Sequence, residues 1–390
     1  MEIASVGVVG GGVMGCGIAQ ALLASGYRVH LKEVDEPLLR KGLAGVASLF
    51  AASAKKAGLA GAEVERRLAA LHGTTSYGDL EAADVVIEAV PEILSLKHQV
   101  LAELDRVCRE DAVLASNTSS LYISELAAVT RRPGRVIGMH WFNPAHRMRL
   151  VEVVPGLETT EATVAACLDF ARSLGKSPVV VKECAGFLVN RLLGLYVNEA
   201  LRLLEEGSSP DEVDGAARGL GLPMGPLELG DLVGWDTIAR ANGTLSREYG
   251  SRFALPAVFE ALVEGGFLGA KAGRGIRDYA GARAATPSAG RTADPSLAGR
   301  LLLCLLNEGI RCLDEGVASE AAIESALKLG AGLPRGPLEW ADELGLDRVL
   351  GDLEVLRERL GERFLPSALL RRKVAARHLG KASGRGFLTY

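Results

Sequence analysis

The sequence predicts an α/β domain with a doubly wound, mostly parallel sheet, followed by two tandem all-α helical domains. Up to about residue 181, short apolar strands alternate with helical patterns, which is typical of parallel sheets covered by helices. From Gly186 onward, Leu- and Ala-rich helical segments replace the strands. This helical part then recurs after a stretch rich in Ala, Gly, Ser, Thr and Pro.

The first strand, helix and second strand carry a G-x-G-x-x-G pattern. An apolar strand ending at Val9 is followed by Gly10, Gly12 and Gly15, and then by an apolar helical segment. The first glycine makes the tight turn, the second lets a pyrophosphate approach the backbone, and the third allows helix and strand to pack closely. The N–H groups at the helix N-terminus favour that anion. This unit predicts a Rossmann-type dinucleotide-binding domain.

Glu33 stands at the end of the second predicted strand. A carboxylate there accepts hydrogen bonds from a ribose 2′-hydroxyl, which favours NAD over NADP, although the adjacent Lys32 keeps NADP as an alternative. A glycine-rich turn that binds nothing is the other interpretation. Strand, glycines, helix, strand and acid all fall in register within about 30 residues, which favours binding.

The rest of this domain is predicted in the same way. Residues 38–71 are helix-compatible, and a break at 58–61 predicts a helical hairpin. Lys55 and Lys56 near that break are most simply solvated charges, with a phosphate contact as the alternative. Further buried strands are predicted at 83–90, 113–116, 136–139, 150–154 and 177–181.

Polar residues follow several of these strands: Glu92 and Lys97, then Ser119, then His140 and Asn143. Ligands of open α/β sheets bind at the carboxyl ends of the strands, so we expect these residues near the site. The separation of Glu92 and Lys97 does not match an i,i+4 helical pair.

Glu152 lies among apolar residues inside the strand at 150–154, where burying an unpaired carboxylate would be costly. His140, earlier in the chain, is the candidate partner. A carboxylate on one imidazole nitrogen fixes the tautomer and stabilises the imidazolium, and the other nitrogen can then take a proton. From the spacing alone, an outward-facing Glu152 and an ordinary loop histidine are equally acceptable.

Composition restricts the function classes. The net charge is −4 and there is no basic stripe, so nucleic acid is not an expected partner. Six cysteines without a C-x-x-C pair are typical of reduced thiols in a cytoplasmic protein, and the apolar N-terminus lacks the basic region of a signal peptide. We expect no membrane partner and no metal site.

Four motifs taken together resemble the L-3-hydroxyacyl-CoA dehydrogenases: Ser-Asn-Thr-Ser-Ser at 116–120, His-Trp-Phe-Asn-Pro at 140–144, Leu-Val-Glu-Val at 150–153 and Gly-Phe-Leu-Val-Asn-Arg at 186–191. The resemblance covers essentially the whole chain. It implies reversible, NAD-dependent oxidation of a (3S)-3-hydroxyacyl-CoA thioester to the 3-oxoacyl-CoA. The same chemistry on a carrier-protein thioester, or on a small non-thioester 3-hydroxy acid such as L-gulonate or carnitine, is the alternative.

The resemblance also implies a role for each matching residue. His140 is the implied general base, Glu152 orients it, and Ser119 and Asn190 position the reacting oxygen and the thioester. The implied cofactor-contacting residues are Gly10, Gly12, Gly15, Glu33, Glu92, Lys97, Ser119, Asn143 and Lys271. Lys56 loosely matches a position that touches CoA. Because Ser119, His140, Glu152 and Asn190 are intact, a catalytically idle NAD-binding structural protein is disfavoured.

The helical part is duplicated. Asn198 and Glu199 recur as Asn307 and Glu308, and the Leu-Pro-x-Gly-Pro-Leu-Glu run at 222–228 recurs at 333–339. We therefore predict an NAD-binding domain at 1–185, a first helical copy that completes the active site at 186–281, a linker at 282–296 and a second copy at 297–390.

The second copy is expected to be structural. Asn190 corresponds to Gly299 and Lys271 to Ala382, so the second copy lacks both site residues. In the family that the sequence resembles, the helical domain makes the homodimer contact. A fused second copy could occupy part of that surface in cis, since an isologous patch is self-complementary. Both a homodimer and a pseudo-dimeric monomer are open.

Overall fold

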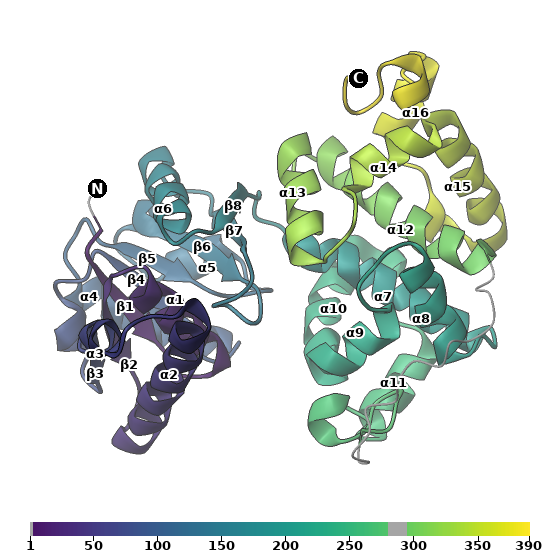
Figure 1. The fold of residues 1–390 in the computed structure, drawn as a ribbon. Helices are drawn as coiled ribbons and strands as arrows, with labels where there is room; N and C mark the ends of the chain where they lie inside the picture. Colours follow the sequence, from purple (N-terminus) through teal and green to yellow (C-terminus); the bar gives the residue numbers. More distant parts are fainter. Residues whose placement is uncertain (1–2, 280–294) are drawn as a thin grey trace. The chain divides into compact units, whose positions relative to one another are not determined.

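The computed structural model describes residues 3–279 and 295–390. They form two compact units, one running to Cys184 and the other from Ala185 to Tyr390 (Figure 1). The predicted linker at 282–296 lies outside the described residues up to residue 294, and the next helix already begins at Pro295. Each unit is described by itself.

The first unit is built on one eight-stranded sheet in the order β3-β2-β1-β4-β5-β6-β7-β8. All neighbouring strands are parallel except β6 and β7, which are antiparallel. The strands are β1 (Ser5–Val9), β2 (Arg28–Lys32), β3 (Leu71–Thr74), β4 (Val85–Glu88), β5 (Val113–Ser116), β6 (Val136–Trp141), β7 (Leu150–Pro155) and β8 (Ser177–Val180). The strand order reverses between β1 and β4, and such a switch point opens a crevice at the strand ends.

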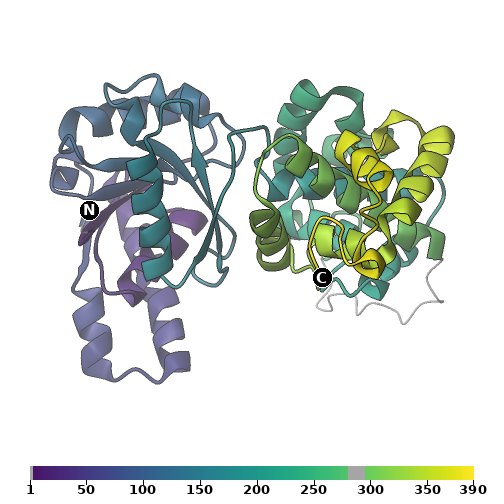
Figure 2. The same ribbon diagram turned by 90° about the horizontal axis from the view of Figure 1, so that it is seen from above.

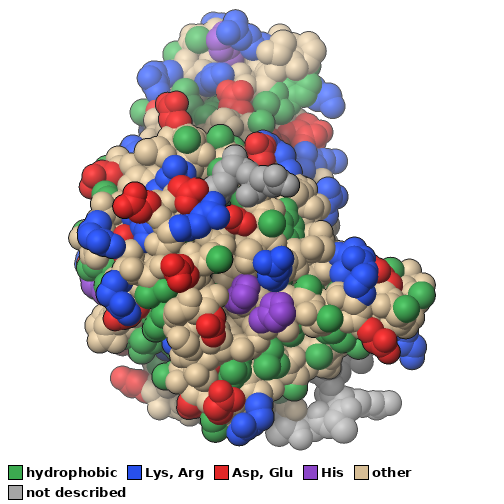
Figure 3. All heavy atoms as spheres, turned by 90° about the vertical axis from the view of Figure 1, so that its left-hand side faces the viewer, with side chains coloured by type: hydrophobic (Ala, Val, Ile, Leu, Met, Phe, Trp, Pro, Cys, Tyr) green, Lys and Arg blue, Asp and Glu red, His purple; other side chains and the backbone are tan. Residues whose placement is uncertain are grey.

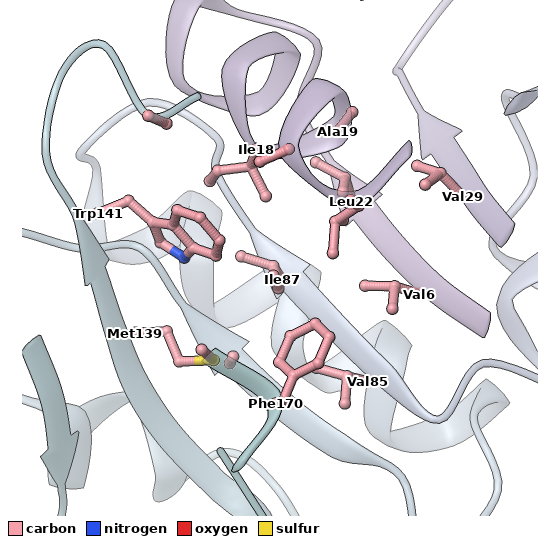
Figure 4. Close-up of a cluster of buried hydrophobic side chains, with 14 of the residues drawn as sticks. Val6, Ile18, Ala19, Leu22, Val29, Val85, Ile87, Met139, Trp141 and Phe170 are labelled. Atoms are coloured by element: carbon pink, nitrogen blue, oxygen red, sulfur yellow. The ribbon is translucent and has the colours of Figure 1, made fainter. Parts of the chain in front are cut away.

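Helices pack against this sheet, and the main hydrophobic core lies between the sheet and two of these helices. Figure 4 shows this core, in which Ile18 and Leu22 of one helix and Phe170 of another share a buried cluster with Ile87 and Trp141 of the sheet. The first of these helices is α1 and the second is α6. The helices of this unit are α1 (Val13–Ala24), α2 (Glu36–Ala57), α3 (Gly61–Leu68), α4 (Leu94–Val107), α5 (Ile123–Ala127) and α6 (Glu161–Ser173).

The predicted helical hairpin is formed by α2 and α3, which project from the sheet in Figure 2. Gly58 ends α2 with a φ of +68°, a left-handed conformation that suits glycine. The helix-compatible stretch is shorter than predicted, because Leu71 begins strand β3 at the edge of the sheet. That strand contains His72 and Gly73, both exposed, so it lacks the apolar run that indicates a buried strand.

The surface of the first unit carries charges of both signs. Figure 3 shows acidic and basic side chains interspersed over this face. Among the helices that the structure describes, none is long and apolar enough to cross a membrane.

The second unit is helical and consists of two copies of one arrangement. Helices α7–α11 are followed by a matching series, α12–α16: α7 (Val189–Glu205), α8 (Pro210–Gly219), α9 (Pro226–Val233), α10 (Trp235–Tyr249), α11 (Ala257–Glu264), α12 (Pro295–Asp314), α13 (Glu320–Gly330), α14 (Pro337–Leu344), α15 (Leu346–Leu360) and α16 (Ala368–Ala375). Asp231 accepts the backbone N–H groups of Ile276 and Arg277, and Asp342 likewise accepts those of Phe387 and Leu388. In both copies, therefore, an aspartate carboxylate binds the backbone of the C-terminal loop at equivalent positions.

The sequence pattern predicts a single helix over 230–249, and this prediction is wrong. The structure has two helices, α9 and α10, that meet at Gly234. Gly234 has a φ of +97°, which a helix interior does not accommodate. The break recurs in the second copy at Gly345, between α14 and α15.

Candidate active site

The glycine-rich loop connects β1 to α1. A Cβ atom added at Gly10 would stand 2.7 Å from the Ala89 carbonyl oxygen, and one at Gly15 would stand 1.8 Å from the Gly10 carbonyl oxygen. A Cβ at Gly12 would meet no atom within 4 Å. Gly10 and Gly15 are therefore required by the fold itself, whereas Gly12 leaves open space in front of the helix.

Gly12 is also the N-cap of α1 and has no side chain that could accept the first N–H groups of the helix. An anion in the open space would meet these N–H groups and the positive end of the helix dipole. These residues fit the pyrophosphate of a dinucleotide.

Glu33 closes one side of the loop. Its Oε1 accepts the Gly11 N–H at 2.6 Å, and its Oε2 accepts the Val34 N–H at 3.0 Å, so the carboxylate is held against the glycine loop. The Lys32 ammonium lies over the ring of Tyr77 at 3.9 Å from its centroid, and burial lowers the pKa of Lys32. Glu33 thus presents a fixed acceptor beside the place that fits the pyrophosphate.

Replacing Gly12 with alanine is expected to weaken NADH binding by about tenfold or more while the protein keeps its fold, because the new methyl group fills only the open space. Titration of NADH fluorescence measures the affinity, and thermal denaturation checks the fold. Gly15→Ala is the comparison, and it should lower the melting temperature because its Cβ would overlap the Gly10 carbonyl oxygen. An unchanged NADH affinity in Gly12→Ala would contradict the binding of the cofactor pyrophosphate at the open space beside Gly12.

A buried charge cluster lies at the ends of β4 and β5. Lys97 of α4 is 1 % exposed, and its Nζ is 2.7 Å from Oε1 of Glu88 and 3.2 Å from Oε2 of Glu92. Ser116 donates its hydroxyl to the other oxygen of Glu88 at 2.6 Å. Glu92 precedes the start of α4 at Leu94, so helical spacing does not govern its contact with Lys97.

Glu88 was missed by the sequence reasoning, and it is the fully buried partner of Lys97. The signal that could have found it is a glutamate ending a strand whose other residues are Val, Val and Ile. Such a buried carboxylate needs a partner.

Glu92 organises the loop that carries Ser119. Its Oε1 accepts the backbone N–H groups of Ser119 at 3.0 Å and Ser120 at 3.1 Å, and also the Thr118 hydroxyl. Burial acts to raise the pKa of Glu92, but the Lys97 ammonium and these hydrogen bonds outweigh it and hold that pKa below its ordinary value. The loop is therefore fixed by an ionised carboxylate.

His140 and Glu152 form a buried pair across β6 and β7. The antiparallel register places them opposite each other, and Nδ1 of His140 is 2.6 Å from Oε2 of Glu152. Glu152 has no exposed surface and His140 is 6 % exposed. Of the two orientations that the sequence left open for Glu152, the structure has the inward one, and the contact fixes Nδ1 as the nitrogen that faces the carboxylate.

Asn117, to which the sequence reasoning gave no role, ties the end of β5 to the end of β6. Its Oδ1 accepts the backbone N–H of Trp141, next to His140, at 2.9 Å. Its own N–H donates to the Glu88 carbonyl oxygen at 2.8 Å. The strand end that carries His140 is thereby joined to the strand end that carries Glu88.

The remaining predicted site residues fall into two groups. Ser119 is partly buried and Asn143 is exposed in the first unit, on loops that follow β5 and β6, and Lys56 is exposed in the last turn of α2. Asn190 belongs to the first turn of α7 in the second unit, and there Lys271 forms an ion pair with Asp236. The ligands that these residues meet stay predictions. In the part of the chain that the structure describes, no group of three or more His, Cys, Asp or Glu side chains could hold a metal ion.

The glycine loop at a helix N-terminus, with an acid after the next strand, defines a dinucleotide-binding α/β protein. Comparison with protein-family models is more specific. The NAD-binding domain of 3-hydroxyacyl-CoA dehydrogenase matches residues 5–184, and the C-terminal domain of the same enzymes matches twice, at 186–279 and 297–390. The chain belongs to the 3-hydroxyacyl-CoA dehydrogenase family.

Known relatives agree with this assignment. The fatty acid oxidation complex subunit alpha of Shewanella amazonensis is 38% identical over 393 residues, which cover 96% of this chain and 56% of the relative. The chain therefore spans about half the length of the curated relatives that it matches.

Two solved structures are also similar. The 3-hydroxybutyryl-CoA dehydrogenase of Escherichia coli K12 is 31% identical, with a TM-score of 0.89 over 96% of this chain and 99% of that one. The (S)-3-hydroxybutyryl-CoA dehydrogenase of Ralstonia eutropha is 42% identical, with a TM-score of 0.69 over 71% of this chain and 99% of that one.

Proposed function

We propose that the protein catalyses the reversible, NAD-dependent oxidation of a (3S)-3-hydroxyacyl-CoA to the 3-oxoacyl-CoA, with His140 as the general base. The observation that carries the proposal is the buried hydrogen bond between His140 and Glu152, in the same unit as the glycine loop. The names of the similar solved enzymes, which are 3-hydroxybutyryl-CoA dehydrogenases, support the thioester as the substrate class.

The pair provides a proton acceptor of fixed orientation. With Nδ1 directed at Glu152, Nε2 is the nitrogen that takes the proton of the substrate 3-hydroxyl, and the carboxylate stabilises the imidazolium that results. NAD⁺, when bound, supplies the acceptor for the hydride that leaves C3. In the reverse direction the imidazolium returns the proton to the carbonyl oxygen.

Ser119 and Asn190 are assigned to the positioning of the reacting oxygen and the thioester. Ser119 suits this role because its loop is held by Glu92, which is itself ionised and paired with Lys97. A side chain on a fixed loop loses little further freedom when it binds a substrate. Glu33, Glu92, Lys97, Asn143, Lys271 and the three glycines are assigned to the cofactor.

The test follows NADH absorbance with acetoacetyl-CoA, and with acetoacetate as the matched substrate that lacks the thioester. Rapid oxidation with acetoacetyl-CoA alone, competitively inhibited by another acyl-CoA, supports the proposal. Turnover of acetoacetate without inhibition by an acyl-CoA would contradict the thioester and indicate a small 3-hydroxy acid as the substrate. Turnover only of an acetoacetyl carrier protein would move the thioester to that carrier.

Glu33 leads to a prediction about the cofactor. NADH is expected to bind at least about tenfold more tightly than NADPH, because a 2′-phosphate would be repelled by the fixed carboxylate. Glu33→Gln should reduce the difference between the NADH and NADPH affinities, because the glutamine amide has the size of the carboxylate but no negative charge. Fluorescence titration with both nucleotides measures it, and equal affinities in the wild type would contradict the assignment of Glu33.

A further inference from the structure

Two buried arginine–glutamate clusters join the two helical copies. In the first cluster, Arg191 of α7 has no exposed side-chain surface, and its Nε is 2.7 Å from Oε1 of Glu308 in α12. Nη1 of Arg191 is 2.7 Å from Oε2 of Glu315, and the Tyr249 ring covers the guanidinium. Both carboxylates belong to the second copy. Both acidic partners of Arg191 named here therefore come from the other copy, whereas Tyr249 belongs to the first copy.

The second cluster repeats the first with the copies exchanged. Arg300 of α12 pairs with Glu199 and Glu206 of the first copy, and its Nη2 is 2.7 Å from Oε1 of Glu206. The duplicated sequence aligns Arg300 with Arg191, Glu199 with Glu308, and Glu206 with Glu315. The two clusters are thus equivalent across a pseudo-two-fold relation, as in an isologous interface.

The clusters differ in what stands next to each arginine. Arg191 directly follows Asn190, the residue assigned to the substrate, whereas Arg300 directly follows Gly299. The carboxylates of the second copy, Glu308 and Glu315, therefore bind the arginine that adjoins the assigned site residue Asn190. The carboxylates of the first copy bind Arg300, which adjoins a glycine.

The backbone before Asn190 needs such an anchor. Gly186 has a φ of +70° and Phe187 a φ of +50°, and a left-handed backbone at a bulky residue persists only where its surroundings enforce it. The Arg191 N–H donates to the Gly186 carbonyl oxygen at 3.1 Å and closes this turn. The turn that presents Asn190 is thereby tied to the position of Arg191.

We propose that Glu308, together with Glu315, is a positioning residue for Asn190, so that the second copy helps to build the active site although it lacks site residues of its own. Removal of the Glu308 carboxylate takes away the fully buried counter-charge of Arg191 and leaves it Glu315, whose side chain is 43% exposed. A buried charge whose close partner is lost forces its surroundings to rearrange. The turn at 186–191 is the adjoining segment with a strained backbone. The inference rests on the proposed function for the role of Asn190, but the anchoring itself does not.

The experiment compares Glu308→Gln with Glu199→Gln. Both variants break an equivalent buried cluster, so their melting temperatures should fall by similar amounts. In Glu308→Gln, kcat with acetoacetyl-CoA is expected to fall by about ten- to a hundredfold, since small misplacements of positioning groups have effects of that size. Glu199→Gln should keep wild-type kcat, and NADH affinity should be unchanged in both.

A second readout does not depend on turnover. Amide hydrogen exchange over residues 186–194 should accelerate in Glu308→Gln and stay at the wild-type rate in Glu199→Gln. If the buried variants fail to fold, Glu315→Gln and Glu206→Gln form a milder pair, because these carboxylates are 43% and 45% exposed. Equal exchange over 186–194 in both members of a pair overturns the anchoring.

A double variant with Asn190→Ala tests whether the effect passes through that residue. If it does, Glu308→Gln lowers kcat in the wild type and adds little in the Asn190→Ala background. Full additivity would overturn the positioning role. A wild type that turns over no thioester but shows the expected exchange difference would reject the proposed function and leave Glu308 as the anchor of the turn.

Discussion

Replacing His140 with alanine is expected to reduce NADH oxidation with acetoacetyl-CoA by about two to four orders of magnitude. The substitution removes the imidazole that pairs with Glu152, so the substrate hydroxyl loses the proposed proton acceptor. NADH affinity should change little, because His140 is not one of the residues assigned to the cofactor. Steady-state kinetics measure the loss, and fluorescence titration measures the affinity.

His378→Ala is the control for this variant, because His378 follows α16 in the second helical copy and is not one of the assigned site residues. Its turnover should equal that of the wild type. A His140→Ala enzyme that retains more than about a tenth of wild-type kcat would exclude His140 as the general base, because a general base contributes a factor of at least about a hundred to the rate.

The parts of the fold that follow from neighbouring residues were predictable from the sequence. Gly10, Gly12 and Gly15 stand within one strand–helix unit, and together with the following strand and Glu33 they predicted a dinucleotide-binding turn. The break at Gly234 was not predictable from apolar periodicity, because the residues on both sides are helix-compatible. The edge strand β3 was missed because its exposed side chains leave no apolar run.

Contacts between distant residues were harder to predict. His140 and Glu152 lie on adjacent strands, and the cost of burying Glu152 suggested the pairing without deciding it. Glu88 and Lys97 pair through a loop that helical spacing does not describe. Arg191 and Glu308 are 117 positions apart, and only the folded helices bring them together. The duplication indicated that an interface exists, but not which charges cross it.

Replacement of Lys97 with methionine is expected to lower the free energy of unfolding by about 3–5 kcal/mol, because removing one partner of a buried ion pair leaves an uncompensated charge. Glu88 has no exposed surface, and Lys97 is its partner at 2.7 Å. Glu92 loses the same ammonium, so the loop of Ser119 should loosen and NADH affinity should fall. Arg106→Met is the matched control on the same helix, since the pair of Arg106 with Glu103 is exposed and should contribute little.

The loss in Lys97→Met should depend on pH in a defined direction. Glu92 has a folded-state pKa below its ordinary value of 4.5. The stability that ionised Glu92 contributes is therefore complete above pH 4.5 and is lost as the pH falls through the folded-state pKa. Below that pKa the Glu92 carboxyl is protonated in both the native and the unfolded protein, so it no longer favours either state. Urea denaturation of wild type and variant at neutral pH and below pH 4.5 measures this, and the difference should shrink in acid. A difference in unfolding free energy that is just as large below pH 4.5 would contradict this role of the Lys97 ammonium.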